Sequence, residues 1–221
     1  MEKLVYVDRR NTNCNKWDGQ TGMFGEEGLH AMWVADMDFK TASCVIDALK
    51  EYVESGVYGY YKVPEEYYQS FINWEREHHN LVIKKEWIRF SPGVVAGFHW
   101  LVQMLTEPGE AVIVNTPVYY PFLNAVKNNN RRLICSDLIC DGGHYQINYE
   151  DFEKQIDEEH VKLFILCSPH NPGYGRRKSL QKYLKSAESI RCILFPMKSI
   201  RILYLEIISI LHHCVLKSIV I

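Results

Sequence analysis

The sequence lacks the features of a secreted, membrane-inserted or nucleic-acid-binding protein. Its start, MEKLVYVDRRNTNCNKWDG, contains no apolar run of the kind that a signal peptide needs. The formal net charge is only -2 at pH 7, and the 25 Lys and Arg residues are dispersed instead of gathered into a basic patch. We therefore expect a cytoplasmic protein that binds neither nucleic acid nor a membrane.

Patterns for disulfides and metal sites are also missing. The chain has seven cysteines, an odd number, and they are widely spaced with no Cys-x-x-Cys pair. The nine histidines include the adjacent pairs His78-His79 and His212-His213, but neighbouring residues of a helix point in different directions. The sequence thus predicts reduced core thiols and no metal site.

What the sequence does contain is a regular alternation of helical and apolar segments. Strands are predicted at 111–115, 132–138 and 161–167. Helices are predicted at 41–55, from Pro64 onward, between Pro92-Gly93 and Pro108-Gly109, at 120–128 and at 149–156. Strands that alternate with helices and are apolar throughout are typical of a parallel sheet covered on both faces. We expect an α/β fold of three layers with a mostly parallel sheet.

Three of these helices have apolar residues at helical spacing. Such residues share one face of a helix and predict the side that packs on the core. They are Val45, Leu49 and Val53 in the first helix, Tyr67, Phe71 and Trp74 in the second, and Phe98, Leu101, Val102 and Leu105 in the third.

Three loops fall where a parallel sheet collects its ligands, at the ends of strands and the starts of helices. Free amides after Gly93, at a helix start, would suit a phosphate, although many helices begin with Pro-Gly. Tyr119 follows a buried strand, and its ring could stack on a planar ligand or simply pack. Asn171 follows another buried strand, and its amide could donate to a phenolate oxygen or belong to a simple turn.

Taken together and in this order, the three loops resemble those of the fold-type-I pyridoxal-phosphate enzymes, the aminotransferase class I/II superfamily. MWVADMDF at 32–39 and GVYGY at 56–60 resemble one branch of it, the carbon-sulfur beta-lyases that act on cystathionine or cysteine S-conjugates. The resemblance covers about residues 1–172 and implies the large domain of that fold, truncated. It further implies an N-terminal small-domain segment and substrate lip at 1–45 and a partial cofactor-binding domain at 46–172.

The resemblance also assigns residues to a site for pyridoxal 5'-phosphate. Gly93, Val94 and Val95 would bind the phosphate, Tyr119 would stack on the pyridine ring, and Asn171 would hydrogen-bond the ring hydroxyl. Tyr60 would reach the cofactor phosphate of a neighbouring subunit, which implies a homodimer. Ala35 and Asp36 would lie near the substrate, a small sulfur amino acid.

The implied activity is a lyase reaction of the EC 4.4.1 type that releases a thiol, pyruvate and ammonia; an aminotransferase is the alternative enzyme. The family's Ser-Asp-Glu-Ile-His motif and its Ser-x-Ser-Lys motif, with the lysine that forms the Schiff base, do not occur in the sequence. Lysines 178, 182, 185 and 198 lack the family's setting, so no catalytic residue is assigned. A non-catalytic truncated fragment is therefore the second functional hypothesis.

The composition changes at Gly173. Residues 173–221 contain no Asp and end in IRILYLEIISILHHCVLKSIVI. Charged and polar residues such as Glu206 and Lys217 interrupt this segment and argue against a membrane helix. Codons for FPMKSI at 195–200, read from their third bases, permit Ser-Asp-Glu-Ile-His. We therefore interpret 173–221 as a frameshifted tail without a domain of its own, an interpretation that the coding DNA can contradict.

Overall fold

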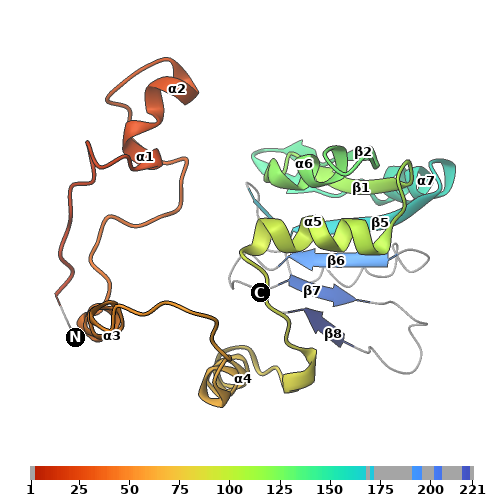
Figure 1. The fold of residues 1–221 in the computed structure, drawn as a ribbon. Helices are drawn as coiled ribbons and strands as arrows, with labels where there is room; N and C mark the ends of the chain where they lie inside the picture. Colours follow the sequence, from red (N-terminus) through yellow and green to blue (C-terminus); the bar gives the residue numbers. More distant parts are fainter. Residues whose placement is uncertain (1–2, 168–169, 172–190, 196–201, 206–215, 220–221) are drawn as a thin grey trace. The chain divides into compact units, whose positions relative to one another are not determined.

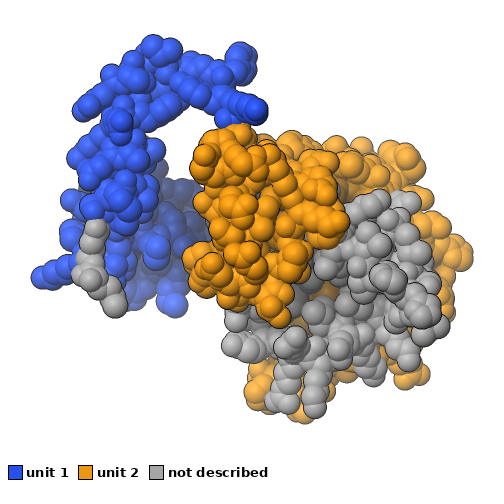
Figure 2. All heavy atoms as spheres, turned by 90° about the horizontal axis from the view of Figure 1, so that it is seen from below, with its two compact units in different colours: residues 1–62 blue, residues 63–221 orange. Residues whose placement is uncertain are grey.

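The structure is a computed structural model that describes residues 3–167, 170–171, 191–195, 202–205 and 216–219, the last three ranges by backbone pairing alone. Its contacts divide the chain into two compact units, Met1–Lys62 and Val63–Ile221, coloured separately in Figure 2. This division differs from the border expected after residue 45. The domain limits given by the resemblance stay predictions.

The first unit has short helices and little core. Its helices are α1 (Asn15–Asp18), α2 (Gln20–Phe24) and α3 (Ser43–Glu54) (Figure 1). Of its described residues, only Cys14, Gln20 and Asp38 are buried. Polar contacts therefore hold this unit together more than apolar packing does.

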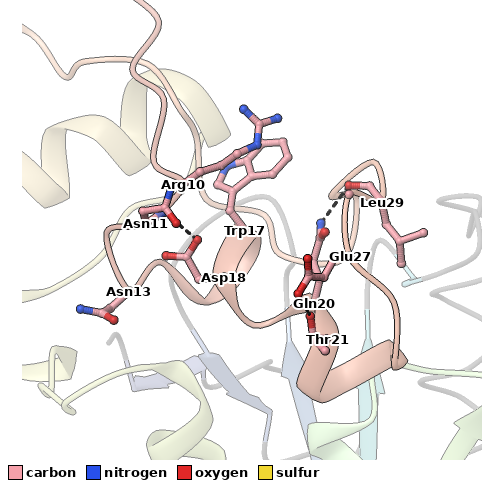
Figure 3. A pocket seen from close by; sticks show the side chains of 10 residues that line it. Arg10, Asn11, Asn13, Trp17, Asp18, Gln20, Thr21, Glu27 and Leu29 are labelled. Atoms are coloured by element: carbon pink, nitrogen blue, oxygen red, sulfur yellow. Dashed lines mark hydrogen bonds between the residues drawn. The ribbon is translucent and has the colours of Figure 1, made fainter.

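A polar cavity of about 460 Å³ lies inside the first unit. Figure 3 shows Arg10 over the ring of Trp17, with its guanidinium carbon 4.6 Å from the ring centroid. In another wall Gln20 donates to the Leu29 carbonyl oxygen at 2.9 Å. The lining includes none of the residues that the resemblance assigns to substrate or cofactor.

The second unit is built on a six-stranded sheet in the order β2-β1-β5-β6-β7-β8. The strands β2, β1, β5 and β6 are parallel, whereas β7 and β8 are antiparallel to their neighbours. A separate antiparallel hairpin joins β3 to β4. The strand bounds are β1 Ala111–Thr116, β2 Arg132–Asp137, β3 Ile139–Asp141, β4 His144–Gln146, β5 Val161–Cys167, β6 Arg191–Phe195, β7 Ile202–Leu205 and β8 Leu216–Ile219.

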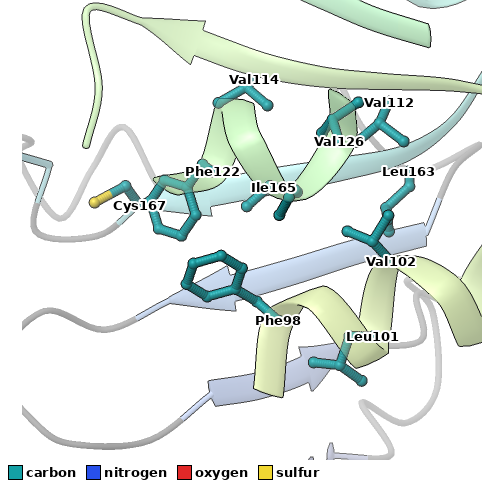
Figure 4. Close-up of a cluster of buried hydrophobic side chains, with 11 residues drawn as sticks. Phe98, Leu101, Val102, Val112, Val114, Phe122, Val126, Leu163, Ile165 and Cys167 are labelled. Atoms are coloured by element: carbon teal, nitrogen blue, oxygen red, sulfur yellow. The ribbon is translucent and has the colours of Figure 1, made fainter. Parts of the chain in front are cut away.

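Helices cover both faces of this sheet. The helices α5 (Val94–Leu105) and α6 (Pro121–Lys127) pack on one face, and α7 (Tyr149–Glu158) packs on the other. Residues of β1 and β5 alternate between the two apolar clusters: Val112 and Leu163 face α5 and α6, whereas Ile113 and Phe164 face α7. The predicted three-layer, mostly parallel α/β fold is confirmed (Figures 1 and 4).

The remaining helices precede the sheet. The helix α4 (Glu65–His79) is followed by a short 3-10 helix, η1 (Lys85–Trp87). The predicted packing face of α4 is wrong in part, because Tyr67 and Trp74 are 54% and 55% exposed. A stripe shifted by one residue, with Tyr68, Phe71 and Ile72, packs on Ile83 and Ile88 instead. In α3 the predicted face of Val45, Leu49 and Val53 is exposed.

The C-terminal strands extend the sheet. The strand β6 pairs with β5 over Leu163↔Arg191 to Cys167↔Phe195, so β5 lies inside the sheet. The interpretation of 173–221 as a tail without a domain did not foresee these strands. The start of the proposed frameshift, at Gly173, lies outside the described residues. No helix of the described segments is long and apolar enough to cross a membrane.

Candidate active site

The loops after β1 and β5 meet at the carboxyl edge of the sheet. These strands are adjacent and parallel, in a register that places Val114 opposite Ile165, so the chain leaves both at the same edge. The backbone N–H of Tyr119 donates to the Asn171 carbonyl oxygen at 2.9 Å. Two residues that the sequence singles out separately are therefore direct neighbours.

The start of α5 packs on the same core cluster as Tyr119. Phe98, in the first half of α5, is fully buried with its ring centroid 5.0 Å from that of Phe122 in α6, and it shares a cluster with Cys167 at the end of β5 (Figure 4). Val94, the first residue of α5, packs against the same cluster, as does Tyr119. The helix start and the Tyr119–Asn171 pair therefore border one patch of core.

Gly93 precedes α5 with φ 132° and ψ 157°, a conformation that residues with a side chain rarely adopt. A Cβ at this position would meet no atom of the described residues within 4 Å. The first amides of a helix have no partner within the helix and carry the positive end of its dipole. The amides of Val94 and Val95 are thus suited to an anion.

The side chain of Tyr119 is half-buried. Its ring meets Phe122 edge-on, with centroids 5.9 Å apart, and tilts against Tyr120 at 5.6 Å. Burial, and to a smaller extent the charge of Tyr120, raise the pKa of the Tyr119 hydroxyl above its ordinary value. The ring is held by packing on one side and remains partly accessible at the edge of the sheet.

Burial also raises the pKa of the Cys167 thiol, to about 11, while a backbone hydrogen bond from Asn171 lowers it by a smaller amount. The thiol in the unfolded chain ionises near 9.0, so between these values the unfolded state releases its proton first. The free energy of unfolding should fall by about 2 kcal/mol as the pH rises from about 9 to about 11.

Urea unfolding at a series of pH values measures this slope. Cys167→Ala should reduce this slope, whereas the same substitution at the exposed Cys44 should leave it as it is. An unchanged slope in Cys167→Ala would mean that another group titrates in this range.

The predicted substrate and partner residues lie in the first unit. The guanidinium of Arg9 pairs with the Asp36 carboxylate at 2.5 Å, and the amine of Lys16 donates to the Asp36 carbonyl oxygen at 2.9 Å. Tyr60 is fully exposed. The proposed roles of Asp36, its neighbour Ala35 and Tyr60 stay predictions.

No short-range sequence pattern indicates the most buried of the ion pairs described in this unit. Lys16 and Asp38 are joined at 2.7 Å, with side chains 11% and 9% exposed. The hydrogen bond from Lys16, and then that from Trp17 at 3.0 Å, hold the pKa of the Asp38 carboxyl below its ordinary value. Lys16 also binds the carbonyl oxygen of Asp36, so the same amine holds the backbone at Asp36 and the side chain of Asp38.

The site fits part of pyridoxal phosphate. The amides at the start of α5 suit the phosphate, the partly exposed ring of Tyr119 suits the pyridine, and the amide of Asn171, whose backbone bonds that of Tyr119, suits the ring hydroxyl. A lysine is not found there among the described side chains of these elements: Lys162 is the second residue of β5 and Lys127 ends α6, both toward the opposite edge. The described residues therefore supply binding groups for the cofactor and no amine.

Parallel strands between helical layers, with a helix start that follows a glycine of positive φ and an aromatic ring at the carboxyl edge, define an α/β protein of the pyridoxal-phosphate-dependent transferase class. Residues 34–189 match the family described as Aminotransferase class I and II. The chain belongs to this family.

Individual relatives agree with the assignment. Cystathionine beta-lyase PatB of Bacillus subtilis is 39% identical over 82% of this chain and 46% of its own length. Two solved structures superpose with a TM-score of 0.77: cystalysin from Treponema denticola, which contains pyridoxal 5'-phosphate, and the PLP-bound C-S lyase from Staphylococcus hominis. They are 34% and 32% identical, covering 87% and 86% of this chain and 50% and 49% of theirs. The chain thus spans about half the length of the relatives it matches.

Proposed function

We propose that this chain carries the cofactor-binding half of a pyridoxal-phosphate-dependent carbon-sulfur beta-lyase. The observation that supports it most is the direct contact between Tyr119 and Asn171, beside the open helix start at Gly93. The similarity to PatB and to the Staphylococcus hominis C-S lyase favours a lyase over an aminotransferase.

Each binding group has a defined task in this proposal. The amides of Val94 and Val95, next to Gly93, donate to the cofactor phosphate. The ring of Tyr119 covers the pyridine, and the side-chain amide of Asn171 donates to the ring hydroxyl. When bound, pyridoxal phosphate supplies an acceptor for the electron pair left at the substrate Cα after proton removal.

A small sulfur amino acid, cystathionine or a cysteine S-conjugate, is the proposed substrate, with Ala35 and Asp36 lining its place. We further propose a homodimer in which Tyr60 reaches the cofactor phosphate of the second subunit. The complete exposure of Tyr60 and the exposed apolar face of α3 favour such a contact.

For the 221-residue chain by itself, we propose cofactor binding without turnover. The sequence holds neither Ser-Asp-Glu-Ile-His nor Ser-x-Ser-Lys, and no binding energy replaces a missing amine that must move the α proton. The chain is then a binding fragment of the lyase.

Two measurements on the purified chain test this proposal. 4'-Deoxypyridoxine 5'-phosphate lacks the aldehyde and reports binding without a covalent bond, and we expect it to bind. With pyridoxal phosphate and cystathionine present, we expect no pyruvate. Absence of ligand binding would contradict the cofactor site, whereas pyruvate release would contradict the non-catalytic state.

A further inference from the structure

His170 joins the two loops of the candidate site at a second point. Its Nε2 lies 2.6 Å from the carbonyl oxygen of Pro117, 53 residues away in the sequence. Because a carbonyl oxygen only accepts, Nε2 is the donor in this bond. Together with the bond from Tyr119 N–H to Asn171 O, at 2.9 Å, it forms what we term the loop clasp: Pro117 and Tyr119 on one loop, His170 and Asn171 on the other.

Each loop is anchored to the sheet only up to its own strand. On the first loop, the backbone N–H of Leu138 donates to Thr116 O at 2.7 Å, where β1 ends. On the second loop, the strand β5 ends at the buried Cys167. The two bonds of the loop clasp therefore tie together segments that reach beyond the ordered ladder of β1 and β5.

The loop clasp sets the separation between Tyr119 and Asn171, which affects the binding of a planar ligand. Tyr119 and Asn171 would approach the same ring, one from its face and one at its edge, so their separation decides whether both can bind at once. The bond of His170 joins positions close to both binding residues: Pro117 lies two residues before Tyr119, and His170 lies one residue before Asn171. A histidine bonded in this way acts on the backbone of the opposite loop, and neither bond of the loop clasp involves a residue of α5.

We propose that His170 is a positioning residue of the cofactor site: its bond to Pro117 holds the Tyr119 loop at the right distance from Asn171. This inference rests on the proposed function for the identity of the ligand, and on the structure alone for the clasp. His170 is not a catalytic residue here, because its Nε2 is engaged with a backbone carbonyl.

The test compares two variants and a control. His170→Ala removes the donor, and His170→Gln retains an N–H donor on a side chain of similar reach. His78→Ala is the matched control, because His78 also contacts a backbone carbonyl, that of Trp74 at 3.1 Å, on the surface of α4. Hydrogen exchange of the amides of residues 118–120 reports the clasp, and affinities for 4'-deoxypyridoxine 5'-phosphate and inorganic phosphate report the site.

We expect His170→Ala to speed exchange at 118–120 and to weaken the binding of the ring-containing ligand about fivefold, the effect of one lost hydrogen bond. Phosphate affinity should stay within about twofold, and His170→Gln and His78→Ala should resemble the unaltered chain. Unchanged exchange in His170→Ala, or an equal loss of both affinities, would overturn the proposal. If the unaltered chain binds neither ligand, the proposed function fails and the cofactor role of His170 with it, while the exchange rates still decide whether the clasp exists.

Discussion

Replacing Gly93 by alanine should weaken the binding of inorganic phosphate and of 4'-deoxypyridoxine 5'-phosphate by about tenfold to a hundredfold. Gly93 holds φ 132°, where a side chain costs about 1–3 kcal/mol even though a Cβ would meet no atom within 4 Å. Alanine would relax toward negative φ and turn the first amides of α5 away from the ligand. Each charge-assisted hydrogen bond lost in this way costs about 1.5–3 kcal/mol.

Gly109 offers a matched control for this substitution. It also has a positive φ, 86°, and open space, but it lies just before β1 begins, at the opposite edge of the sheet. Gly109→Ala should lower the free energy of unfolding by a similar amount and leave phosphate binding unchanged. Isothermal titration of both variants with phosphate distinguishes the effect of backbone strain from the loss of a binding site. Equal phosphate affinities in the two variants would argue against a phosphate site at α5.

Most of the fold could be predicted because its signals are local. A strand buried on both faces is apolar at every position, and a helix that covers it repeats its apolar residues every three to four positions. The α5 face with Phe98, Leu101 and Val102 follows from this period and is confirmed by the burial of all three side chains. The exposed face of α3 has the same period. Periodicity therefore predicts an apolar face but does not predict whether that face is buried, or against which element.

Long-range packing determines the features that the sequence analysis predicted wrongly or missed. The helix α4 carries two overlapping aromatic stripes, and Ile83 and Ile88 select the one with Tyr68. The hairpin of β3 and β4 turns at Gly142-Gly143, both with positive φ, a two-residue turn signal that could have been recognised.

In the candidate site, too, the sequence predicts some residues and misses some contacts. Tyr119 and Asn171 could be named because each follows a buried strand, and adjacent parallel strands bring such residues together. The side chain of His170 contacts a backbone carbonyl 53 residues away in the sequence, and Lys16 and Asp38 are 22 residues apart. No short-range sequence pattern predicts either contact, because the two partners are far apart in the sequence and meet only when the chain has folded.

Phe98→Ala should lower the free energy of unfolding of the second unit by about 3–5 kcal/mol, the usual cost of removing a fully buried ring. The cavity would open between α5, α6 and Cys167, so the start of α5 should also lose its anchor and bind phosphate more weakly. Phe164→Ala removes an equally buried ring on the α7 face, whose centroid lies 5.0 Å from that of Phe152. It should cost as much stability without changing phosphate affinity.

Urea unfolding gives the stabilities, and phosphate titration in a stabilising osmolyte gives the affinities of the folded variants. Phe98→Leu retains most of the side-chain volume and provides a folded comparison with the helix in place. Loss of phosphate affinity in Phe98→Ala but not in Phe164→Ala would tie the anion site to the packing of α5. Equal affinities in both would place that site elsewhere on the chain, because a helix start that has lost its packing cannot keep its amides aimed at one point.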